Sequence, residues 1–140
     1  MDTKKLIIAI AAGFAVQMGG LFLLHSVLLK QDYIITAQLW RMPDEVIDRM
    51  WALAVAVLIY VTGAAIIYAK GIEDKPWFLQ GIRFGALLAM VQAIYTNVSL
   101  WVVVPIPHEL SIKMIFGEVV IAFLFALVLA AIYRPQFEEA

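Results

Sequence analysis

The stretch from Met114 to Tyr133, MIFGEVVIAFLFALVLAAIY, is apolar apart from one acid, Glu118. A hydrocarbon core of about 30 Å is crossed by about 20 residues of helix, which is the length of this run. A helix also satisfies its own backbone hydrogen bonds where no water is available. The stretch therefore predicts a membrane-spanning helix that carries a carboxylate.

The composition of the whole chain indicates more than one such span. Hydrophobic residues make up 64% of the 140 positions and charged residues 15%, whereas globular proteins average about 45 to 50% and about 25%. The charges cluster between four long apolar gaps. We therefore expect one domain over residues 1–140, an all-α, polytopic transmembrane four-helix bundle with spans near 6–29, 50–69, 84–104 and 114–133.

Several classes of protein are disfavoured by the same composition. The chain has no cysteine, so disulfides and thiolate-held metals are excluded. A net charge of −1 argues against nucleic acid as a partner. The first apolar run, up to Leu29, is longer than the core of about 7 to 15 residues in a secretory signal, so we expect an uncleaved span.

The segment 30–49 is mixed in character. Residues such as Tyr33 and Trp40 make it too apolar for an ordinary loop, so it is expected to lie along the membrane interface. Pro43 suits the first turn of a helix, which predicts that the second helix begins there and runs to Lys70.

The basic residues predict an orientation. Six of the ten Lys and Arg residues flank the ends of the spans on the side of the termini, and four flank the other side. The positive-inside rule then places both termini in the cytoplasm.

Small residues recur at helical spacing in two of the spans. Gly13, Gln17 and Gly20 lie at i, i+4 and i+7, and Gly81 and Gly85 lie at i and i+4. Missing side chains let another helix approach closely. We expect both sets to face partner helices.

Counting from the outer charge clusters brings several polar residues to similar depths. At about 1.5 Å per residue, Glu118, His25, Asn97 and Tyr95 fall roughly 7 to 15 Å below the outer boundary. Gln17 and Gln92 fall near the midplane, and Gln92 is expected to share a face with Tyr95. These residues predict an outward-facing polar pocket in which Glu118 binds a proton or small ligand with His25 as its titrating partner.

The alternative is that the polar residues only hold helices together. Such contacts stabilise membrane helices by about 0.6 kcal/mol on average, and Gln17, Gln92 and Asn97 fit that role singly. An acid in the membrane costs about 2.5 to 3.5 kcal/mol, so Glu118 favours a functional role. A pairing of His25 and His108 as haem ligands is a further alternative, but His108 lies at a helix boundary, and no close ligand spacing predicts a metal or cofactor.

Short motifs along the chain are similar to those of a group of uncharacterised small bacterial four-helix membrane proteins. They are His25, Tyr33, Tyr68-Ala69-Lys70-Gly71, Gly81, Gly85, Pro105-Ile106-Pro107, Gly117 and Tyr133-Arg134-Pro135. The resemblance implies a bacterial cytoplasmic membrane and no activity. The lone carboxylate also resembles that of small multidrug-resistance exporters, but theirs lies in the first helix and Glu118 in the fourth, so drug export is not carried over.

The leading expectation is a non-enzymatic membrane protein that binds or carries a small ligand or proton at Glu118, as a homo-oligomer in the lipid bilayer. The alternative is an accessory subunit that packs into a larger membrane complex through its glycine faces. A haem- or quinone-linked subunit is the third possibility.

Overall fold

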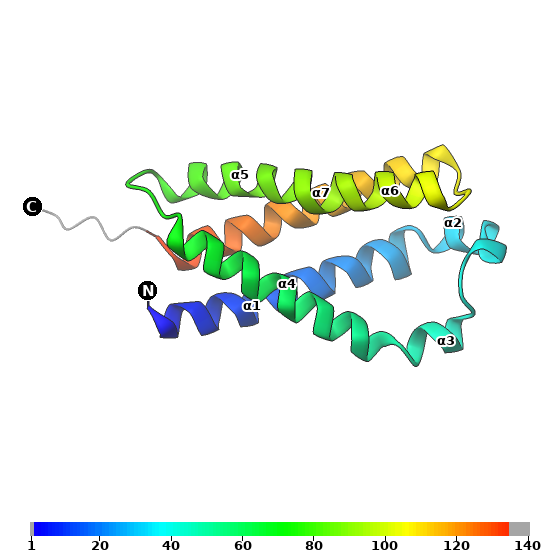
Figure 1. Ribbon diagram of the computed structural model, residues 1–140, viewed down its shortest axis with the longest axis horizontal. Helices are drawn as coiled ribbons and strands as arrows, with labels where there is room; N and C mark the ends of the chain where they lie inside the picture. The colour runs from blue at the N-terminus through cyan, green and yellow to red at the C-terminus, as the bar shows by residue number, and fades with distance from the viewer. Residues whose placement is uncertain (1, 135–140) are drawn as a thin grey trace, which may run out of the picture.

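The computed structural model describes residues 2–134, and all regular structure within that range is helical (Figure 1). Four stretches are long and apolar enough to cross a membrane, namely Thr3–Leu28, Met50–Lys70, Trp77–Val103 and His108–Ile132. The predicted all-α bundle of four helices is therefore confirmed, and it supports a multi-pass membrane protein.

Two of the four stretches contain a π-helical segment. The first of the four stretches consists of α1 (Thr3–Phe22) and the π-helical η1 (Leu23–Leu28). The second of the four is α4 (Met50–Lys70) alone. The third consists of α5 (Trp77–Leu88), the π-helical η3 (Ala89–Ile94) and α6 (Tyr95–Val103), and the fourth is α7 (His108–Ile132). Between the first two lie α2 (Lys30–Ile35), the 3₁₀ turn η2 (Ala37–Leu39) and α3 (Pro43–Ile47).

The bundle has two distinct ends (Figure 1). The start of α1 and the end of α7 lie together at what we call the terminal end. The short helices α2 and α3 lie at the opposite end, which we call the loop end. An even number of spans brings the two helix ends back to one side.

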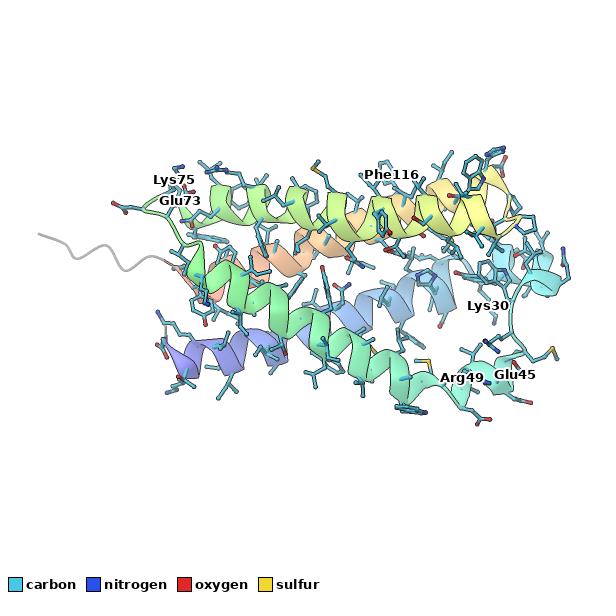
Figure 2. The ribbon with its side chains drawn as sticks, in the orientation of Figure 1. Lys30, Glu45, Arg49, Glu73, Lys75 and Phe116 are labelled. Carbon is cyan, nitrogen blue, oxygen red and sulfur yellow. The ribbon has the colours of Figure 1, made fainter. Side chains whose placement is uncertain are left out.

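Helix α7 is the centre of the bundle, since it packs against α1 and α5 along much of its length. Its buried residues follow a spacing of three and four, which is the periodicity of one helical face. They are Leu110, Ser111, Met114, Glu118, Ile121, Ala122, Phe125, Ala126, Leu129 and Ala130. By contrast, Phe116 of the same helix is 74% exposed and points away from the bundle (Figure 2).

The glycines of both small-residue sets face α7. A Cβ added to Gly13 would collide with the ring of Phe125, and one on Gly20 would lie 2.9 Å from Ile121. On α5, a Cβ on Gly85 would lie 2.8 Å from the side chain of Phe123. A Cβ on Gly81 would likewise lie 3.0 Å from Ala130. The absence of these side chains is what lets α1 and α5 approach α7 closely.

The second helix differs from the prediction that it runs unbroken from Pro43 to Lys70. The chain turns between α3 and α4, where the Arg49 amide bonds to the carbonyl of Val46 in a tighter turn than an α-helix makes. The Arg49 guanidinium donates to the carbonyl of Glu45 at 2.8 Å. This side chain satisfies a carbonyl that an ending helix leaves without a partner, so the break is stable.

At the terminal end, the connection between α4 and α5 is held by one buried side chain. The Gln80 amide donates to the carbonyls of Glu73 at 2.8 Å and Lys75 at 2.6 Å, and its oxygen accepts from the Glu73 amide at 3.0 Å. Glu73 also pairs with Lys75 and, at 3.3 Å, with Arg83 (Figure 2). The turn is therefore fixed by α5 itself.

Candidate functional site

Glu118 lies on the buried face of α7 and is 8% exposed. Its carboxylate is 3.6 Å from Nε2 of His25, which belongs to η1. That distance is longer than a hydrogen bond but short enough for an ion pair when the imidazole is protonated. The expectation that His25 is the partner of Glu118 thus agrees with the geometry, although the two residues are far apart in sequence.

His25 lies within a π-helical turn. The Leu29 amide donates to the carbonyl of Leu24 at 2.9 Å, a bond from residue i to i−5 instead of i−4. One extra residue in the turn changes the face on which the following side chains lie, and such π turns often occur at functional sites. The side chain of Leu24 occupies the place that a Cβ on Gly117 would take. The π-helical turn that carries His25 therefore lies close to the backbone of α7 beside Glu118.

The other ring nitrogen of His25 is also in contact with a side chain. Nδ1 lies 2.6 Å from the hydroxyl of Tyr33 on α2. Burial, and then the charges of Glu118 and Asp32, raise the pKa of Tyr33 to about 12. Tyr33 therefore keeps its proton, and the tautomer of His25 decides which of the two groups donates the hydrogen bond.

A cavity of about 760 Å³ opens beside this group at the loop end. His25 and Tyr33 form part of its wall, and the rest comes from α2, α3 and the segment between them. The Tyr33 ring is held by Trp40, whose ring meets it edge-on at 5.1 Å between centroids. The indole of Trp40 in turn donates to the Thr36 hydroxyl at 2.9 Å. The contacts Glu118–His25–Tyr33 thus connect a buried acid to a solvent-accessible pocket.

The two glutamines predicted near the midplane do not contact this group. Gln17 is 2% exposed, and its Oε1 has no hydrogen-bond partner among residues 2–134. Gln92 accepts a hydrogen bond of 3.2 Å from the hydroxyl of Tyr60 on α4. The Tyr60 ring packs against Phe125, which lies seven residues, or about two helical turns, after Glu118 on α7. These residues therefore connect helices deeper in the bundle.

Asn97 and Tyr95 do not contact Glu118, His25 or Tyr33 either. Asn97 is buried, but its amide donates to the Ala93 carbonyl of its own helix at 2.8 Å. Tyr95 is 69% exposed, so the prediction that it lines the pocket with Gln92 is wrong. That prediction assumed an α-helix between the two residues, whereas η3 is π-helical there, and the wider turn moves Tyr95 to another face.

His108 lies apart from the group as well. Its ring packs against Trp101, with centroids 5.1 Å apart. Nδ1 of His25 contacts Tyr33, and Nε2 lies 3.6 Å from Glu118. Within residues 2–134, no three His, Asp or Glu side chains gather in a way that would hold a metal ion.

The sequence did not predict two tyrosines that hydrogen-bond to the candidate residues, Tyr33 with His25 and Tyr60 with Gln92. Tyr33 was assigned to the membrane interface, and Tyr60 was counted as part of an apolar span. A tyrosine eight residues after a membrane histidine is a weak signal, because only the turn at Leu29 returns Tyr33 to His25. Comparison with known proteins finds no family model, no curated protein and no solved structure that matches the chain.

Proposed function

We propose that this protein binds a small ligand in the cavity at the loop end and takes up a proton at the Glu118–His25 pair as it does so. The observation that carries the proposal is the unbroken series of contacts from Glu118 through His25 to Tyr33 in the cavity wall. An acid in a membrane helix is costly, and it is usually paired or used. Here it is paired with the side chain whose charge changes between about pH 5 and 8.

The charged and titratable groups near His25 favour this coupling. Protonation would turn the 3.6 Å contact with Glu118 into an ion pair, and Nδ1 would then donate to the Tyr33 hydroxyl. The affinity for a ligand that contacts Tyr33 would then depend on whether the Glu118–His25 pair is protonated. Lys30 and Arg41 lie in the cavity wall, and Arg41 meets Glu45 of α3 at 3.5 Å. Asp32 on α2 is bound by Lys113 of α7. The loop end also carries Asp44, Asp48, Arg49 and Glu109, which do not line the cavity.

The test is to measure proton uptake by the pair. Thermal stability of the detergent-solubilised wild type should change between pH 8 and pH 5, together with the carboxyl absorption in the infrared. Glu118→Gln keeps the shape of the side chain but cannot titrate, so it should fold normally and lose the pH dependence. His25→Gln should lose it as well.

His108→Gln is the matched control, since His108 packs on Trp101 outside the group. It should keep the wild-type pH dependence. A pH response that is the same in the wild type and in Glu118→Gln would refute the proposal and leave Glu118 as a contact between helices.

We further propose that the loop end faces outward and that both termini are cytoplasmic in a bacterial inner membrane. Support comes from the excess of basic residues at the terminal end. Reporter fusions after residue 140 and within residues 30–49 should report opposite sides. An outward C-terminus would reverse the orientation and leave the four helices unaffected.

A further inference from the structure

The wall of the loop-end cavity has two chemically different parts. One carries cations, because Lys30 and Arg41 both line it. The other is apolar and includes Ile34, Val46 and Ile47. A volume of about 760 Å³ falls within the range of about 300 to 1,000 Å³ that ligand sites usually have.

The residues that line the cavity include these two cations and no Asp or Glu. Asp32 lies next to the wall residue Tyr33, but its carboxylate is bound by Lys113 at 2.8 Å. Lys30 has no ion-pair partner among residues 2–134, and Figure 2 shows it at the loop end. Arg41 meets Glu45 at 3.5 Å, an exposed pair of the kind that contributes little. A negatively charged group is the natural complement of this wall.

The apolar part of the wall is exposed although it lies outside the four spans. Ile34 is 58% exposed, Val46 44% and Ile47 67%. Exposed apolar patches rimmed by polar residues mark binding sites for apolar groups or membranes. A ligand that covers these residues while it meets the cations must have a hydrocarbon part and an acidic head.

We propose that the ligand of this cavity is an anionic lipid. Its acidic head group lies between Lys30 and Arg41, and its chain lies over Ile34, Val46 and Ile47. The inference rests on the proposed function, because it names the ligand of the same site.

The experiment is native mass spectrometry of the full chain released from nanodiscs. Nanodiscs of phosphatidylglycerol should yield protein with one retained lipid, and those of phosphatidylcholine should not. Inorganic phosphate added at millimolar concentration should not displace the lipid, because it lacks the chain. Displacement by phosphate, or equal retention of both lipids, would overturn the assignment of an anionic lipid.

Two variants separate the cavity from general attraction to a charged surface. The double variant Lys30→Gln, Arg41→Gln should lower retention about tenfold or more, the effect of losing a charge-assisted contact. Ala37→Trp leaves every charge in place but fills the cavity from its wall, and it should abolish retention. Ala52→Trp, at an exposed position of α4 outside the cavity, is the matched control and should retain the lipid. Unchanged retention in Ala37→Trp would show that the lipid lies elsewhere.

Comparison at pH 5.5 and pH 8 distinguishes this inference from the proposed function. Both hold if retention is stronger at pH 5.5 and Glu118→Gln removes that difference. If the lipid is retained equally at both pH values, the lipid assignment stands and the proton coupling fails. If the protein shows a Glu118-dependent pH response but retains no anionic lipid, the assignment of the ligand fails and the coupling stands.

Discussion

The half of the bundle nearer the terminal end, which we call the terminal half, and the loop end differ in how their backbone packs. In the terminal half, α7 buries Phe125, Ala126, Leu129 and Ala130 completely, and glycines of α1 and α5 bring the neighbouring helices into close contact. At the loop end, the same helix buries an acid, and the surrounding chain consists of a π turn, short helices and a cavity.

The difference shows what each kind of backbone can do. Regular helices with small residues pack closely, and in lipid that packing is the main source of association between helices. A continuous helix presents its side chains at fixed intervals, so it does not easily enclose a ligand. The irregular segments at the loop end bring Tyr33 to His25 and leave a pocket beside them. We therefore expect stability to be concentrated in the terminal half and ligand binding at the loop end.

The largest effect on this contrast is expected from Gly85→Leu. Its first carbon alone would lie 2.8 Å from the side chain of Phe123 and 3.1 Å from its Cα, so α5 and α7 would have to separate. Overpacking of this kind costs about 1 to 3 kcal/mol or more. Thermal unfolding in detergent measures the loss. Ala86→Leu on the exposed side of α5 is the control, and an equal, small effect at both positions would show that the glycine face is not an interface.

An intermediate effect is expected from Tyr60→Phe, which removes the 3.2 Å hydrogen bond to Gln92 between α4 and η3. Polar contacts between membrane helices average about 0.6 kcal/mol, so the loss should be near that size. A double-mutant cycle with Gln92→Leu isolates the pair. A coupling free energy of zero would mean that the hydrogen bond adds nothing to stability. A coupling free energy that changes with pH would show that the Tyr60–Gln92 contact is linked to the Glu118–His25 pair.

The smallest effect is expected at the turn of the terminal end. Lys75, which hydrogen-bonds Glu73, and then Arg83 hold the pKa of Glu73 below its ordinary value. A lowered pKa stabilises the folded state above the ordinary value of 4.5, and this contribution is lost as the pH falls through the folded pKa. Because Glu73 is exposed, Glu73→Gln should lower the melting temperature only slightly at pH 7 and not at all in acid. A larger loss at pH 7, or a loss that persists in acid, would mean that Glu73 stabilises the turn by something other than its charge.

The sequence by itself determined the number and approximate position of the apolar spans, because hydrocarbon leaves an apolar chain few alternatives to a helix of the right length. It also indicated that Gly13, Gly20, Gly81 and Gly85 would face other helices, and that His25 would lie at the depth of Glu118. These inferences use only composition and a regular rise along the helix axis. None of these inferences depends on which helices are neighbours.

The tertiary structure alone decided which polar residues meet. It brought Tyr33 to His25, paired Tyr60 with Gln92, and moved Tyr95 to the outside. The reason is that the π turns η1 and η3 add a residue where counting assumes 3.6 per turn, so every face beyond them shifts. A pattern read along one helix does not contain that information, because it assumes a constant number of residues per turn.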